Sequence, residues 1–241
     1  MVHLGNEGWQ RDVCGMHRLQ HRGILKEIAL FQPDSLYRIH PVNSFATPTP
    51  AIEEGFVYVH FGRYGSACLN TETGEKVWER TDLICEHVQG PGSSVFLYKD
   101  MVILHMEGID RMRIYALDKQ TGEVFWFAER NEEWYEGIDE IGRKAYVTPI
   151  VIEVDGRELL ISNGSCVCDA IDVITGDLVW YIPQGEDSTI SMPVESDGIL
   201  YFYTGFVTRE NGEQECELLA VDPSGTGDIT ANILWRVASP M

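Results

Sequence analysis

The sequence has few basic residues for its length. Its 241 residues include 18 lysines and arginines against 38 aspartates and glutamates, which gives a formal net charge of −20. A surface of this sign repels the phosphates of nucleic acids and the headgroups of anionic lipids. We therefore expect neither nucleic acid nor an anionic membrane surface as a partner.

The sequence also lacks long apolar runs. No stretch of about 18 apolar residues is present, so no transmembrane segment is expected. The first residues, MVHLGNEGWQRDVCGMHRLQHRG, hold no apolar core behind their charges and do not resemble a signal peptide. On this ground alone, the chain is either cytoplasmic or lacks its natural start.

The cysteines show no metal-binding spacing. There are six of them, and the two closest, Cys166 and Cys168, form Cys-x-Cys with no Cys-x-x-Cys pair opposite. We therefore expect buried, reduced thiols and no structural zinc. No Gly-x-Gly-x-x-Gly or P-loop pattern follows a strand-like run, so nucleotide binding has no support either.

The sequence does contain an internal repeat. The stretch ALDKQTGEVFW at residues 116–126 recurs three times in related form. The other copies read CLNTETGEKVW (68–78), AIDVITGDLVW (170–180) and AVDPSGTGDITANILW (220–235). The last copy has five extra residues in its turn. Every copy ends in a tryptophan, at Trp78, Trp126, Trp180 and Trp235.

Each copy of the repeat predicts a β-hairpin. The third position is always an Asx residue, whose side chain can bond backbone amides two residues further on: Asn70, Asp118, Asp172 and Asp222. Glycine follows where the turn needs a positive φ, at Gly74, Gly122 and Gly176. The first position is small, and it is alanine at Ala116, Ala170 and Ala220, which leaves room for packing. The tryptophan then offers a large apolar surface to bury.

A second pair of strands precedes each hairpin. In residues 47–62, 93–108, 148–164 and 192–205, a short apolar strand meets a polar turn, and a second apolar strand ends near glycine. Four antiparallel strands repeated at intervals of about 40–50 residues predict the blades of a β-propeller in an all-β fold. A β-sandwich is the alternative, but it would not require the same tryptophan in every unit.

The frame Ala-x-Asp-x-x-x-Gly-x-x-x-Trp resembles the tryptophan-docking motif of the PQQ-like (quinoprotein) β-propeller repeats, over roughly residues 46–237. That superfamily includes PQQ-dependent alcohol dehydrogenases and the outer-membrane assembly lipoprotein BamB. The resemblance implies that each motif tryptophan packs on the neighbouring blade near its motif glycine. It also implies a periplasmic or extracellular location, although this chain shows no signal peptide.

The predicted layout is an irregular segment at residues 1–22 followed by propeller blades over 23–241. The blade units are 46–80, 93–128, 147–182 and 191–237. Residues 23–31 resemble an orphan outer strand with Lys26 near the tryptophan position, and ASPM at 238–241 resembles ATPT at 46–49. We therefore expect about four blades in an incomplete, open propeller that can self-associate through its open blade edges. A closed four-bladed ring is the alternative.

Candidate chemical groups lie near the ends of the second strands and in one loop. His60 and His105 end two of these strands and could adjoin a central channel, where a pair of histidines can bind a metal or ligand. His87 lies in a loop that also carries Ser93 and Ser94. Histidines that are simply hydrogen-bonded inside the blades explain the pattern as well, and nothing in the spacing supplies a hydrolase site.

The resemblance implies that a quinoprotein dehydrogenase holds PQQ with a Ca²⁺ ligated by Glu, Asn and Asp, a stacked Trp, an adjacent Cys-Cys disulfide and an Asp base. The Cys-Cys pair is absent here, and the acidic insertion (residues 129–142, ERNEEWYEGIDEIG) is typical of a solvated loop. We therefore expect no catalytic residues and no metal site. The expected function is a non-catalytic scaffold for a protein or small ligand. The alternatives are a dehydrogenase fragment, whose PQQ and Ca²⁺ residues lie on missing blades, and a partial gene product without a function of its own.

Overall fold

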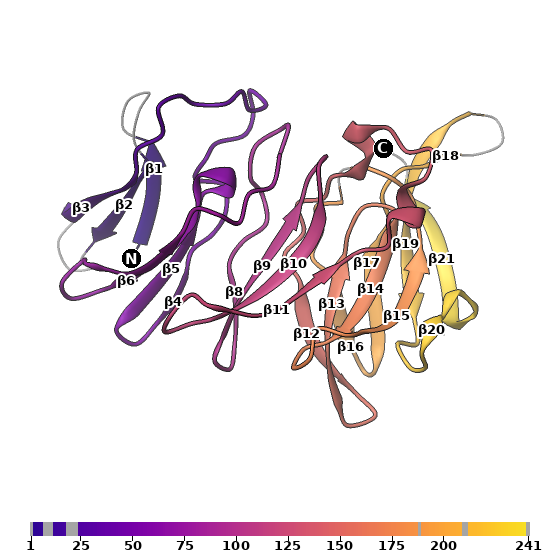
Figure 1. Cartoon of the computed structure of the whole chain (residues 1–241). Coiled ribbons are helices and arrows are strands. Elements are labelled where there is room, and N and C mark those ends of the chain that lie inside the picture. The colour runs from indigo at the N-terminus through magenta and orange to yellow at the C-terminus, as the bar shows by residue number, and fades with distance from the viewer. Residues whose placement is uncertain (1, 7–11, 18–23, 188, 209–211, 240–241) are drawn as a thin grey trace. The chain divides into compact units, whose positions relative to one another are not determined.

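The chain is built almost entirely of β-strands. The computed structural model describes residues 2–6, 12–17, 24–187, 189–208 and 212–239, and their strands form a series of antiparallel sheets (Figure 1). In this part of the chain, no helix has the length and apolar content needed to span a bilayer. The predicted all-β class and the incomplete β-propeller are confirmed.

Four sheets form the blades. Blade I contains β4 (Ala51–Glu53), β5 (Phe56–His60), β6 (Ser66–Asn70) and β7 (Lys76–Arg80). Blade II contains β8 (Phe96–Tyr98), β9 (Met101–Glu107), β10 (Met112–Asp118) and β11 (Val124–Glu129). Blade III contains β12 (Ile150–Val154), β13 (Arg157–Asn163), β14 (Val167–Asp172) and β15 (Leu178–Pro183). Blade IV contains β16 (Val194–Ser196), β17 (Ile199–Tyr203), β19 (Gln214–Val221) and β21 (Ile233–Ser239).

Shorter elements complete the sheets and loops. Strand β18 (Val207–Thr208) pairs with β19, and β20 (Gly227–Asp228) runs parallel to β15 as a fifth strand of blade III. The 3₁₀ helices are η2 (Gly62–Tyr64), η3 (Glu132–Tyr135), η4 (Glu140–Arg143) and η5 (Thr230–Asn232). Both η3 and η4 lie in or at the end of the acidic insertion.

The expectation of an irregular segment at residues 1–22 is wrong for its described part. Strands β1 (Val2–Asn6) and β2 (Asp12–His17) pair with β3 (Ile24–Phe31) in a three-stranded antiparallel sheet, so β3 is not an orphan. Residues 1, 7–11 and 18–22 lie outside the described residues. The sequence hid these strands because strand pairing uses backbone groups, whereas a search for apolar alternation sees only side chains.

The chain divides into two compact units. Unit 1 comprises residues 1–106 and 115–125, and unit 2 comprises residues 107–114 and 126–241. In unit 1, one apolar core joins β3 to blade I, and a second contains the buried side chains of blades I and II. In unit 2, the core contains buried residues of blades III and IV, with Trp180 completely buried among them.

The repeated turn has the same hydrogen bonds in three blades. Asp118 Oδ1 accepts from the backbone N–H groups of Gln120 at 2.8 Å and Thr121 at 2.7 Å. Asn70 and Asp172 accept from the corresponding amides. Gly122 has a φ of 74° and donates to the carbonyl of Asp118, which closes the turn. A side chain other than glycine would strain this backbone.

The motif tryptophans of blades I and II lie directly over the glycine of the next motif. A Cβ atom added to Gly122 would lie 2.7 Å from the Trp78 ring, and one added to Gly176 would lie 2.8 Å from the Trp126 ring. Each indole N–H also donates to a carbonyl of that turn: Trp78 to Lys119 at 2.9 Å, and Trp126 to Val173 at 3.1 Å. Shape and hydrogen bonding therefore fix the same contact twice.

Lys26 on β3 packs against the turn glycine of blade I, where a motif tryptophan would be expected. Its side chain lies 2.7 Å from the position that a Cβ of Gly74 would occupy, and its ammonium group donates to the carbonyl of Thr73. The contact with the glycine is kept, but an aliphatic stem replaces an aromatic ring. The geometry thus tolerates a long side chain of another type, provided that its end donates to the turn.

The last two tryptophans depart from this pattern. Trp180 is completely buried, but no described residue accepts a hydrogen bond from its indole N–H, because the longer turn before β21 places β20 beside Trp180 instead. Trp235 is 44% exposed and contacts the ring of Tyr201. The small residue opposite is nevertheless retained, since Ala170 pairs with Trp180 and Ala220 pairs with Trp235.

A pair of truncations tests the packing of these rings. Trp126→Ala should lower the free energy of unfolding by about 3–5 kcal/mol, because it empties a buried aromatic site. Trp235→Ala is the matched control and should cost about 1 kcal/mol or less, because its ring is already half exposed. Urea denaturation followed by circular dichroism measures both. Equal losses for the two variants would contradict the assigned difference in packing.

A pair of glycine substitutions separates backbone strain from ring contact. Gly122 and Gly156 have nearly the same φ, 74° and 75°, but a Cβ on Gly156 would meet nothing within 4 Å. We expect Gly156→Ala to cost about 1–2 kcal/mol from strain alone. Gly122→Ala should cost about 1–3 kcal/mol more, because its methyl group collides with Trp78. If both variants melt alike in urea, the ring contact contributes nothing.

Candidate functional site

The predicted histidines of unit 1 are buried in pairs with serines. His60 on β5 is 3% exposed, and its Nδ1 lies 2.8 Å from Ser66 Oγ. His105 on β9 is 1% exposed, and its Nδ1 lies 3.3 Å from Ser93 Oγ. His87 is likewise buried. The side chains that sequence analysis selected for chemistry are thus enclosed by protein.

The fifth selected residue, Ser94, has a different environment. Its hydroxyl oxygen accepts a hydrogen bond from the backbone N–H of Thr49 at 3.0 Å. This contact ties the loop after blade I to the segment that precedes β4. Ser94 therefore has a local structural bond.

The interior keeps His60 uncharged. Burial, with a smaller contribution from His87, lowers the pKa of His60 to about 3. A neutral imidazole can ligate a metal, but the described residues contain no group of three or more His, Cys, Asp or Glu side chains arranged to hold one. The geometry therefore provides two buried histidines in successive blades, each with a serine hydroxyl as its hydrogen-bond partner.

Unit 2 contains a buried charge network that sequence analysis missed. Arg130, at the end of β11, forms ion pairs with Glu107 and, at 2.8 Å, with Asp169. Its guanidinium group also donates to Ser162 Oγ at 2.6 Å. Although burial acts to lower the pKa of Arg130, the carboxylates of Asp169 and Glu107 hold it well above its ordinary value. The one available signal was Asp169 itself, a charge within an apolar strand.

The network anchors the acidic insertion and its surroundings. Glu107 accepts hydrogen bonds from the Tyr135 hydroxyl at 3.2 Å and from the backbone N–H of Ser165 at 2.9 Å. Gly164 has to be glycine, because a Cβ there would collide with the guanidinium group of Arg130. One buried cation thus connects the insertion to the loop between β13 and β14.

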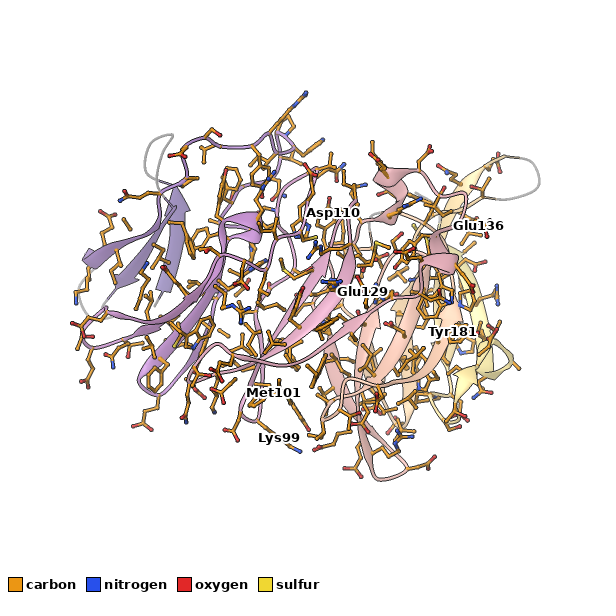
Figure 2. The ribbon with its side chains drawn as sticks, in the orientation of Figure 1. Lys99, Met101, Asp110, Glu129, Glu136 and Tyr181 are labelled. Carbon is orange, nitrogen blue, oxygen red and sulfur yellow. The ribbon has the colours of Figure 1, made fainter. Side chains whose placement is uncertain are left out.

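Beside this network lies a groove of about 640 Å³, which we call the unit 2 groove. Its walls come from the acidic insertion, the loop after β15, the segment from Thr204 to Thr208, and strands β19 and β21. The ring of Trp134 lies 4.9 Å from that of Tyr181 on β15, the strand that ends at the groove residue Pro183. Figure 2 labels Tyr181, and also Glu136 of the insertion.

The groove is lined by apolar and polar side chains together. The apolar lining includes Trp134, Ile138, Phe206, Leu219 and Ile233. The polar lining includes Gln184, Glu186, Thr208, Glu217 and Arg236. Sequence analysis missed this groove because its residues come from segments separated by up to about a hundred positions.

The fold class is that of a β-propeller with PQQ-like repeats, and the comparisons agree with it. The profile of the family described as outer membrane protein assembly factor BamB matches residues 4–227, and the chain belongs to this family. Comparison with curated proteins finds no match.

Solved structures share the fold at low sequence identity. BamB from Moraxella catarrhalis has a TM-score of 0.53 and 14% identity, with 97% of this chain and 74% of that chain covered. Quinohemoprotein alcohol dehydrogenase from Comamonas testosteroni has a TM-score of 0.56 and 16% identity, with 79% and 34% covered. The corresponding enzyme ADHIIG from Pseudomonas putida HK5 has a TM-score of 0.54 and 14% identity, with 79% and 33% covered. This chain therefore spans about one third of the length of either dehydrogenase.

The described residues do not fit PQQ and calcium. Of the buried carboxylates of unit 2, Glu107 and Asp169 bind Arg130, and Glu217 lies 3.4 Å from Arg236. A guanidinium group excludes a cation from the same oxygens. Cys166 and Cys168 are both free thiols, and they are not adjacent in sequence. Trp78 and Trp126 cover turn glycines, so their ring faces are committed to the next blade.

The buried histidine predicts a pH effect on stability. Between pH 6.5 and about 3, the unfolded chain protonates His60 whereas the folded chain does not, so the free energy of unfolding should fall by about 1.4 kcal/mol for each pH unit that is lost. Above pH 6.5 both states are neutral at this residue, and it gives no slope.

The measurement compares the wild type with His60→Gln in urea melts at pH 7.5, 6 and 5. As the pH is lowered, the free energy of unfolding of the variant should fall less steeply than that of the wild type, by up to about 1.4 kcal/mol per pH unit. Parallel declines would mean that His60 is protonated in the folded protein.

Proposed function

We propose that this chain is a non-catalytic scaffold that binds a protein partner. The observation that carries the proposal is a contrast in burial. The three candidate histidines of unit 1 and Ser93 are at most 3% exposed, whereas unit 2 has an accessible groove with aromatic and charged walls. A buried imidazole cannot reach a substrate, but a groove of mixed polarity can hold one surface of another molecule.

Exposed apolar side chains on blade IV support the same proposal. Trp235, Leu234 and Val237 on β21 are 44–57% exposed, and Met192 and Val194 are similarly exposed. Exposed apolar side chains occur at interaction surfaces, whether for another protein or for a second copy of this chain. The description of the family as an assembly factor also fits a binding role. A periplasmic or extracellular location is part of this proposal, by family membership.

The second candidate is a part of a PQQ-dependent dehydrogenase whose cofactor residues lie elsewhere in a longer protein. The fold likeness to two quinohemoprotein alcohol dehydrogenases favours it, over about one third of their length. Under this alternative, PQQ and Ca²⁺ would bind through residues that this chain does not contain.

A dye-reduction assay separates the two candidates. The 241-residue chain, and the full product of the gene that encodes it, are incubated with PQQ and Ca²⁺ and then given a panel of alcohols and sugars. We expect no substrate-dependent reduction of the dye by either protein, with a known quinoprotein dehydrogenase as the positive control. Substrate-dependent reduction of the dye by either preparation would contradict the scaffold function and support the dehydrogenase alternative.

A further inference from the structure

The walls of the unit 2 groove are charged in a way that favours a cation. Its lining residues include two carboxylates, Glu186 and Glu217, and one guanidinium group, Arg236. Arg236 lies 3.4 Å from Glu217, so its positive charge is partly offset there. No ion pair of Glu186 is observed within the described part of the chain. A carboxylate in a partly buried groove is a site for a positively charged group.

The groove also offers an aromatic face and a hydrogen-bond acceptor. Trp134 is partly exposed and its ring contacts that of Tyr181. An indole face attracts ammonium and guanidinium groups. Gln184 donates through Nε2 to Asn163 and Gly164, but its Oε1 is buried without a hydrogen-bond donor among the described residues. A buried acceptor is favoured by a ligand that brings an N–H group.

The electrostatic field of the acidic insertion around the groove is also negative. The acidic insertion presents six exposed carboxylates, of which Glu129 is paired with Arg113: Glu129, Glu132, Glu133, Glu136, Asp139 and Glu140. Its single basic residue, Arg130, is buried in the network with Glu107 and Asp169 and does not offset them at the surface. Such a field raises the local concentration of cations and speeds their association.

The groove is held in shape before a ligand arrives. Arg130 and Glu107 fix the insertion through Tyr135, as described above. Gln184 N–H donates to the Cys166 carbonyl at 2.8 Å, and Cys166 N–H donates to the Gly185 carbonyl at 3.0 Å, so the loop after β15 is fixed too. A site that is ordered in advance loses less conformational freedom on binding.

We propose that the unit 2 groove binds an extended, basic segment of a partner protein, with a lysine or arginine side chain held by Trp134 and Glu186 and apolar neighbours against Phe206 and Ile233. The proposal rests on the scaffold function and names the chemistry of the partner. A volume of about 640 Å³ suits a few side chains. An acidic protein with this groove has charge complementarity only with a basic partner.

Fluorescence anisotropy with two labelled peptides tests the proposal. The first is a nine-residue peptide that alternates arginine and leucine, and the second has glutamate in place of every arginine. We expect saturable binding of the basic peptide, weakening as salt is raised, and no binding of the acidic one.

Variants of the full chain then place the binding. Glu186→Gln and Trp134→Leu should each weaken binding of the basic peptide by about fivefold or more. Glu153→Gln removes one exposed carboxylate of unit 2 that does not line the groove, and it should leave binding unchanged. Thermal melts check that all three variants fold. Equal weakening by Glu153→Gln and Glu186→Gln would mean diffuse attraction to an acidic surface and would overturn the proposal.

A competition distinguishes a protein segment from a small cation. Arginine methyl ester should displace the peptide only at concentrations at least about tenfold above those of the unlabelled peptide, because it lacks the apolar neighbours. Displacement at equal concentrations would assign the groove to a small organic cation instead. If neither peptide binds and the dye assay is negative, the proposal for the groove is wrong but the proposed scaffold function is unaffected. A positive dye assay would contradict the scaffold function itself.

Discussion

The contact between an indole ring and a turn glycine is the constraint on which the packing of these blades depends. It requires a backbone with positive φ, the absence of a Cβ atom, and a carbonyl that accepts the indole N–H. Trp78 on Gly122 and Trp126 on Gly176 meet all three conditions with nearly equal distances. Because the ring lies on the backbone itself, it holds the residue that carries it directly against the turn of the next motif. Lys26 makes the same two contacts with a different side chain, since it packs on Gly74 and donates to a carbonyl of that turn.

Blade IV shows what happens when the turn changes. Its longer turn removes the glycine platform and brings β20 alongside Trp180, whose ring stays buried but whose N–H has no acceptor among the described residues. Burial of a large aromatic ring outweighs one missing hydrogen bond, which is worth only about 1 kcal/mol net. The docking contact therefore consists of a large apolar term and a smaller directional term, and only the directional one is lost here.

The second organising element is the buried cation Arg130. A guanidinium group with two carboxylates is costly to bury, but its hydrogen bonds to Ser162 and Asp169 satisfy it. The network also determines where the acidic insertion lies and so shapes one wall of the groove. Exposed acids on the insertion would otherwise repel one another and keep the loop solvated. The buried cation thus turns a segment with the composition of a solvated loop into part of a defined surface.

The sequence by itself determined the repeat, because the Asx–Gly–Trp frame acts locally: an Asx side chain shapes its own turn, and a ring of fixed size recurs at the same place in each blade. From this frame the four-stranded blades, the all-β class and the incomplete propeller could be predicted. The strands β1 and β2 could not, since they have only 5 and 6 residues and carry no copy of the frame. The histidines were identified, and hydrogen-bonded histidines inside the blades were one of the two interpretations that the sequence allowed. Only the tertiary structure brought Arg130, Glu107 and Asp169 together and placed Trp134, Glu186 and Arg236 around one groove. Contacts between distant segments depend on how the sheets and loops pack, and no periodicity in the sequence records that packing.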